Sequence, residues 1–125
     1  RAGHEPPLLL HLDGSVERIP HSPGMALGLW DTITLDERTI ELLPGDTLLL
    51  YTDGMTDCRD PKGEPFGLER IKNTLSDFAN LNAQQVCDNL LETLKKYQDG
   101  SKQDDDVTLV AVNTASASST IRLKK

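Results

Sequence analysis

Short apolar runs separated by turn-forming residues make up the first part of the chain. Residues 7–12 are apolar and predict a strand, Asp13-Gly14 predicts a hairpin turn, and residues 16–19 predict the returning strand. Residues 21–28 contain a proline and two glycines and predict a loop. The pattern therefore predicts that the chain opens with a β-hairpin.

Three more strands are predicted before the middle of the chain. Residues 31–36 alternate between apolar and polar side chains, and residues 39–43 continue as a strand. Pro44-Gly45-Asp46 predicts a tight turn, and the apolar residues 47–52 predict a buried strand after it. Residues 57–67 are polar, contain two prolines and two glycines, and predict a loop.

The spacing of apolar residues then changes to the helical period. Residues 68–78 predict one helix because their apolar positions recur three or four residues apart. A second helix is predicted after Asn82, a good N-cap with Gln85 three residues later, as in a capping box. Its apolar stripe lies within residues 86–97, and Gly100 suits its end.

The end of the chain combines one more strand with a change in composition. Residues 107–112 are apolar and predict a last strand. Residues 114–125 are small and polar, then basic, so we expect a disordered tail there and a domain over residues 1–113. Strands, two helices and a final strand together predict an α+β layered domain.

Carboxylates stand at the ends of two of the predicted strands. Asp53 ends an apolar run and is followed at once by Gly54. Asp104, Asp105 and Asp106 come directly before the last predicted strand, with the second and third nearest to it. Carboxylate oxygens suit Mg²⁺ or Mn²⁺, and a strand end holds a ligand rigidly while leaving it open to water. Taken singly, the first position also fits a turn and the acidic run a solvated loop.

Other polar residues carry weaker signals. Gly3-His4 is a candidate substrate-side or water-binding group, although a lone histidine is more often structural. Cys58 has no evident basic neighbour, which a catalytic thiolate needs, so we interpret it as incidental. The sequence contains no serine-hydrolase elbow, P-loop or dinucleotide fingerprint.

Composition narrows the class of protein. The 125 residues suit one domain, and the net charge of −7 argues against a nucleic-acid partner, which requires a basic surface. The two cysteines lack metal-site or disulfide-framework spacing, which favours a reducing, cytoplasmic setting. No apolar run approaches the roughly 18 residues that cross a membrane, so no membrane contact is expected from this segment.

Six segments stand in an order that matches one protein family. They are AGHEPPLL (2–9), GMALGL (24–29), LPGD (43–46), LLYTDGMTD (49–57), GEPFGLER (63–70) and DDVTL (105–109). In this order they closely resemble the C-terminal half of the stage II sporulation protein E type serine phosphatases. These are bacterial relatives of the type 2C metal-dependent phosphatases and include sigma-factor regulators. The resemblance covers about residues 2–113.

The resemblance implies a fold and a metal site. The fold is a central β-sandwich flanked by helices, in αββα layers, of which this chain would carry the C-terminal half. Asp53 of the Thr-Asp-Gly motif and Asp105 of the Asp-Asp-Val-Thr motif would bind Mn²⁺ or Mg²⁺, with Asp106 adjacent. Gly54 would permit a tight backbone at the site. The Gly3-His4 pair would lie near the cleft.

The resemblance also implies a reaction and its partners. The reaction is hydrolysis of phosphoserine or phosphothreonine on a regulatory protein of the anti-sigma-factor antagonist type, by water that two Mn²⁺ or Mg²⁺ ions activate. The family's other metal-binding aspartates come from an N-terminal half, with no equivalent before Ala2. We therefore expect a fragment with little activity of its own.

Two further expectations follow from a partial domain. Open sheet edges and faces tend to pair with another chain, so a homodimer or strand exchange is expected in any ordered form of this piece. The alternative to a phosphatase is a non-catalytic protein-docking module derived from one.

Overall fold

One antiparallel sheet forms the centre of the computed structural model, which describes residues 4–20, 26–33, 35, 37–101 and 105–114. The sheet has four strands in the order β2-β1-β3-β4, and every neighbouring pair is antiparallel. The strands are β1 (Leu8–Leu10), β2 (Val16–Arg18), β3 (Thr47–Tyr51) and β4 (Leu109–Asn113).

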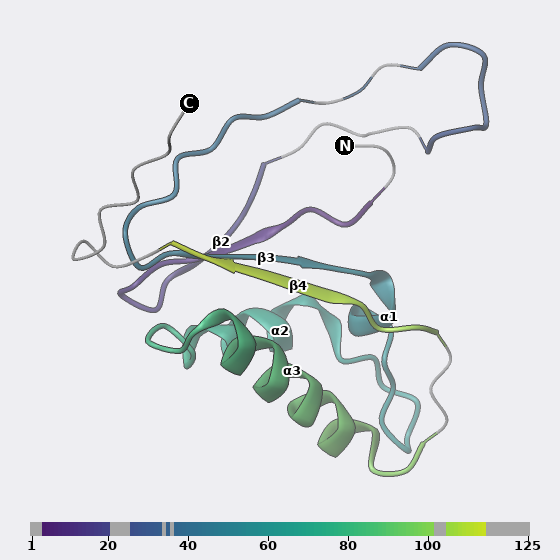
Figure 1. Cartoon of the computed structure of the whole chain (residues 1–125). Coiled ribbons are helices and arrows are strands. Elements are labelled where there is room, and N and C mark those ends of the chain that lie inside the picture. Colours follow the sequence, from purple (N-terminus) through teal and green to yellow (C-terminus); the bar gives the residue numbers. More distant parts are fainter. Residues whose placement is uncertain (1–3, 21–25, 34, 36, 102–104, 115–125) are drawn as a thin grey trace.

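Two helices cover one face of this sheet. They are α2 (Gly67–Ser76) and α3 (Ala83–Gln98), and a single helical turn, α1 (Asp53–Thr56), follows β3 directly. Figure 1 shows α2 and α3 on one side of the sheet and the long segment that leads into β3 on the other. No helix in the described ranges is long and apolar enough to cross a membrane.

The core lies between the sheet and the two long helices. Because side chains alternate along a strand, Leu49 and Tyr51 of β3 point into the core, whereas Leu48 and Leu50 point to the opposite face. The core is mostly aliphatic, as the composition predicts. Its buried members are Leu8, Leu10, Leu49, Tyr51, Met55, Cys58, Phe66, Ile71, Leu75, Val86, Leu90 and Leu94.

The face of the sheet without helices is apolar and only partly covered. Val110 and Val112 of β4 pair with Leu50 and Leu48 and are 51% and 45% exposed. β4 is also an edge strand among the described residues, with β3 as its one neighbour there. A second layer of structure would have an apolar surface to pack on here.

Local signals at the ends of α3 agree with the sequence. Asn82 accepts a hydrogen bond from the amide of Gln85 (2.9 Å), whose side chain accepts one from the amide of Asn82 (3.0 Å). The predicted capping box is therefore confirmed. The C-cap of the helix is Asp99, in a left-handed conformation (φ 44°), and Gly100 follows at φ 82°.

The main error of the sequence prediction concerns residues 31–43. The two strands expected at 31–36 and 39–43 do not form among the described residues of this segment. Most of its apolar side chains are exposed, with Ile33 at 37% and Leu35 at 46%. The alternating pattern marks residues suited to a strand, but none of the described strands pairs with them to form a ladder.

Smaller differences occur elsewhere. The turn α1 was not predicted, because four residues are too few to show a helical period. The expected tail falls outside the described residues beyond Thr114, whose amide donates to the carbonyl of Asp46 (2.9 Å). The α+β class and the positions of the other elements agree with the prediction to within a few residues.

Candidate metal site

The segments that carry the predicted carboxylates lie side by side at one end of the sheet. β3 and β4 are antiparallel, so the end of β3, which leads to Asp53, lies beside the start of β4, which follows Asp106. The amide of Thr52 donates to the carbonyl of Thr108 (3.2 Å) and continues the pairing beyond the two strands. Segments more than 50 residues apart in sequence are thus side by side. Asp104 lies outside the described residues.

Gly54 brings these two segments into backbone contact. A Cβ atom at this position would lie 2.3 Å from the carbonyl oxygen of Asp106 and 2.9 Å from its carbonyl carbon. Gly54 is buried, and its missing side chain is what allows the Asp105–Asp106 backbone to approach this closely.

The side chain of Thr52 links the same segments. Its hydroxyl donates to the carbonyl of Asp106 (3.1 Å) and accepts from the amide of Thr108 (3.0 Å). The sequence interpretation missed Thr52. The available signal was a β-branched hydroxyl residue between an apolar strand and the first carboxylate, with another threonine near the second carboxylate pair.

The three carboxylates at this edge, those of Asp53, Asp105 and Asp106, are exposed to solvent. The carbonyl of Asp53 accepts bonds from the Thr56 hydroxyl (2.9 Å) and the Asp57 amide (2.8 Å), which close the turn of α1. One carboxylate oxygen of Asp105 accepts a bond from the amide of Asp106 (2.7 Å), which orients it.

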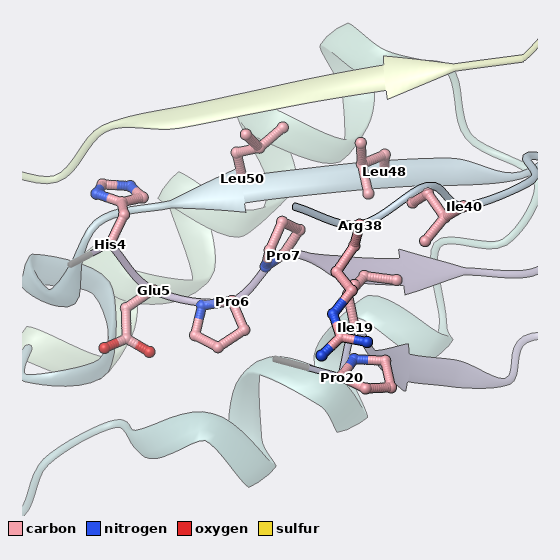
Figure 2. A pocket seen from close by; sticks show the side chains of 10 residues that line it. All are labelled: His4, Glu5, Pro6, Pro7, Ile19, Pro20, Arg38, Ile40, Leu48 and Leu50. Atoms are coloured by element: carbon pink, nitrogen blue, oxygen red, sulfur yellow. The ribbon is translucent and has the colours of Figure 1, made fainter. Parts of the chain in front are cut away.

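The remaining predicted residues are Gly3 and His4. Gly3 lies outside the described residues. His4 is exposed and contributes to a pocket of about 380 Å³ on the helix-free face, together with Leu48 and Leu50 of β3. Figure 2 shows His4 beside Leu50, at the end of β3 that leads into α1. His4 therefore lies toward the same end of the sheet as Asp53.

The donor set fits part of a hard-cation site. Mg²⁺ takes about six oxygens and keeps several of them as water, so one or two protein carboxylates are a usual contribution. Within the described ranges no three histidine, cysteine or acidic side chains gather closely enough to hold a metal ion. The carboxylates of Asp53 and Asp105 suit such an ion by their chemistry, and the segments that carry them are adjacent. These two carboxylates are fewer ligands than a closely spaced pair of metal ions needs.

Cys58 does not belong to this site. It is buried in the core, and burial raises the pKa of its thiol above the ordinary value. A raised pKa disfavours the reactive thiolate at neutral pH. This agrees with its interpretation as incidental.

Comparison with known proteins identifies the family. The chain belongs to the stage II sporulation protein E (SpoIIE) family, whose model matches residues 1–115. It is 39% identical over 112 residues to protein IcfG of Synechocystis sp., covering 89% of this chain and 17% of IcfG. It is 28% identical over 111 residues to the phosphoserine phosphatase RsbU of Bacillus subtilis, covering 87% of this chain and 32% of RsbU.

A solved structure confirms the fold. The chain superposes on the SiaA-PP2C domain of Pseudomonas aeruginosa with a TM-score of 0.71 and 27% identity, covering 90% of this chain and 44% of that one. The chain thus spans less than half of each of these three relatives. The structure is an α+β fragment of a PP2C-like fold, with the four-stranded antiparallel sheet and its helices.

Proposed function

We propose that this chain contributes part of the active site of a metal-dependent phosphatase that hydrolyses phosphoserine or phosphothreonine on a regulatory protein. Family membership and the PP2C-like fold support this proposal. The observation that carries it is the contact of Gly54 with the Asp105–Asp106 backbone, which brings the segments with the two predicted ligands together.

Each site residue has a distinct role in this proposal. Asp53 and Asp105 are ligands of Mn²⁺ or Mg²⁺, with Asp106 adjacent, and none of them is a nucleophile. Gly54 keeps the two ligand segments close, and His4 lies toward the substrate side. When bound, the cations supply Lewis acidity that activates water and offsets charge on the phosphoryl oxygens.

The proposed substrate is a phosphorylated protein of the anti-sigma-factor antagonist type, in bacterial sigma-factor or stress signalling. Support comes from the relationship to RsbU, which is a phosphoserine phosphatase. The chain by itself is expected to show little or no turnover, because its described residues include no cluster of three potential metal ligands.

Ligand substitutions in the full-length protein test the proposal. We expect Asp53→Asn and Asp105→Asn to weaken Mn²⁺ binding in calorimetry at least about tenfold, because each removes a charged ligand. Hydrolysis of a phosphoserine peptide should fall in parallel. Asp77→Asn is the matched control, since this exposed carboxylate follows α2 and lies outside the site.

Three results would change the conclusion. Wild-type Mn²⁺ affinity in both ligand variants would refute the assigned site. Turnover by the isolated chain near that of the full-length protein would refute the proposal that it is inactive alone. If the full-length protein binds its phosphorylated protein partner but shows no turnover, the alternative of a non-catalytic protein-docking module would be favoured.

A further inference from the structure

We propose that Thr52 is a positioning residue that sets the spacing between the Asp53 and Asp105 carboxylates; this inference rests on the proposed metal site. Thr52 lies between the end of β3 and the start of α1, directly before Asp53. It is half-buried and contacts the opposite segment through both its backbone and its hydroxyl group.

The hydroxyl of Thr52 takes the place of a main-chain carbonyl in the sheet. In a hydrogen-bonded antiparallel pair, two residues exchange both of their N–H···O bonds. Here the Thr52 amide donates to the Thr108 carbonyl (3.2 Å), but the return bond from the Thr108 amide ends on the Thr52 hydroxyl (3.0 Å). The side chain thus completes the last pair of the ladder.

Because the Thr52 hydroxyl accepts the bond from the Thr108 amide, the Thr52 carbonyl is available to begin the helical turn. That carbonyl accepts a hydrogen bond from the amide of Met55 (3.0 Å), which closes a turn at the start of α1. The chain can therefore leave the sheet abruptly and turn at Asp53, while β4 stays in register. Without the hydroxyl, the Thr108 amide would lose the bond that holds it at this position.

The same hydroxyl secures the segment that carries Asp105. It donates to the carbonyl of Asp106 (3.1 Å), the atom that also lies against Gly54. The two adjacent segments carry three exposed carboxylates, those of Asp53, Asp105 and Asp106, and their like charges oppose the approach of the segments when no cation is bound. An uncharged link between the two segments opposes their separation, so it keeps the ligands close enough to share one ion.

Removal of the hydroxyl in the full-length protein tests this role. Thr52→Val keeps the β-branched shape and deletes both hydroxyl bonds, whereas Thr52→Ser keeps them. Loss of a partner that orients a metal ligand typically costs about 10- to 100-fold in metal affinity, and we expect this loss in calorimetric Mn²⁺ binding by T52V. T52S should stay within about threefold of wild type, since its hydroxyl is retained.

A second measurement does not depend on metal. Hydrogen exchange at the Thr108 amide should be faster in T52V, by about fivefold or more, because one hydrogen bond is lost. Thr93→Val is the matched control. It also deletes a threonine hydroxyl bond, to the carbonyl of Asn89 (2.8 Å) in α3, and should change neither readout.

The outcomes separate this inference from the proposed function. Faster exchange at Thr108 with wild-type Mn²⁺ affinity in T52V would overturn the positioning role, as would equal losses in T52S and T52V. Wild-type affinity in Asp53→Asn would instead refute the metal site itself. If T52V does not fold, Thr52→Cys is the replacement variant, because a thiol is a weak hydrogen-bonding group. T52C should lose less Mn²⁺ affinity than the amount expected for T52V. Wild-type Mn²⁺ affinity in T52C, together with faster exchange at the Thr108 amide, would also overturn the positioning role.

Discussion

A methyl group on Gly54 would lie 2.3 Å from the carbonyl oxygen of Asp106. No side-chain carbon tolerates such a contact with a main-chain atom, so any larger residue must displace one of the two segments. The displacement would act where the segments that carry the candidate ligands are adjacent.

Gly54→Ala therefore tests the coupling between backbone contact and metal binding. We expect a loss of about 1–3 kcal/mol in unfolding free energy, as for other overpacked sites, despite the higher helix propensity of alanine. Mn²⁺ binding by the full-length protein should weaken as well. Urea denaturation and calorimetry measure the two effects.

Gly63→Ala is the matched control for this substitution. Gly63 has φ 86°, and a Cβ atom added there would meet nothing within 4 Å, so alanine introduces backbone strain without a clash. The strain should cost about 1–2 kcal/mol, which is comparable to the loss expected at Gly54, but Mn²⁺ binding should be unchanged. Equal loss of binding in both variants would show that stability alone explains the effect.

The stability of the protein is expected to respond differently to loss of the hydroxyl group at each of its two tyrosines. The hydroxyl of Tyr51 is buried and has no hydrogen-bond partner among the described residues. The hydroxyl of Tyr97 donates toward the carbonyls of Glu64 (3.2 Å) and Pro65 (3.3 Å). Tyr51→Phe should leave stability unchanged or higher, and Tyr97→Phe should lower it by about 0.5–1.5 kcal/mol in urea denaturation.

Stability at alkaline pH should depend on the same buried hydroxyl. Burial, reinforced by the carboxylate of Glu5, raises the pKa of Tyr51 above its ordinary value. The unfolded chain then ionises first, so this group's contribution is intact below about pH 10 and is lost as the pH rises further. Denaturation midpoints at pH 8 and above pH 10 should diverge less in Tyr51→Phe than in the wild type. An identical divergence would exclude Tyr51 as the cause.

A part-buried hydrogen bond between His11 and Asp46, at the opposite end of the sheet, is expected to stabilise the start of β3. Asp46 is 2% exposed, and its carboxylate accepts from the amide of Leu43 (2.9 Å) and lies 3.1 Å from Nδ1 of His11. A double-mutant cycle with His11→Ala and Asp46→Ala should give a coupling of about 0.5–3 kcal/mol, because the groups are in contact and partly desolvated.

The exposed pair between Glu5 and Arg18 provides the comparison. Its nitrogen and oxygen atoms lie 3.7 Å apart, and both side chains are accessible to water. The same cycle there should give about 0–1 kcal/mol, because solvent screens the attraction. Equal couplings in the two cycles would contradict the role assigned to burial.

Strand β4 should mediate self-association of the isolated chain. It is an edge strand, and Val110 and Val112 expose apolar surface on the face without helices. Light scattering should show an oligomer that Val112→Lys weakens, because an edge lysine disfavours strand addition and apolar packing. Gln84→Lys, on the exposed side of α3, adds the same charge and should have no effect. A monomer at all concentrations would refute this prediction.

Patterns among neighbouring residues were sufficient to predict most of the helices and strands. The hairpin at Asp13-Gly14, the apolar strand before Asp53 and the capping box at Asn82 each depend on neighbouring residues, so their signals are contained in a few positions. The same locality explains the error at residues 31–43. An alternating pattern indicates which residues suit a strand, but it does not indicate whether a partner strand will pair with them.

The residues of the candidate site and the pairing of Asp53 with Asp105 were predicted from the chain alone, but the contacts that bring their segments together were not. Motifs placed carboxylates at 53 and 105 because each borders an apolar run, which is a property of consecutive residues. Only the folded structure showed that Gly54 lies against the carbonyl of Asp106. It also showed that the Thr52 hydroxyl, in place of a main-chain carbonyl, accepts the hydrogen bond from the Thr108 amide. Contacts across more than 50 residues depend on strand order and register, which arise when the whole sheet packs on its helices.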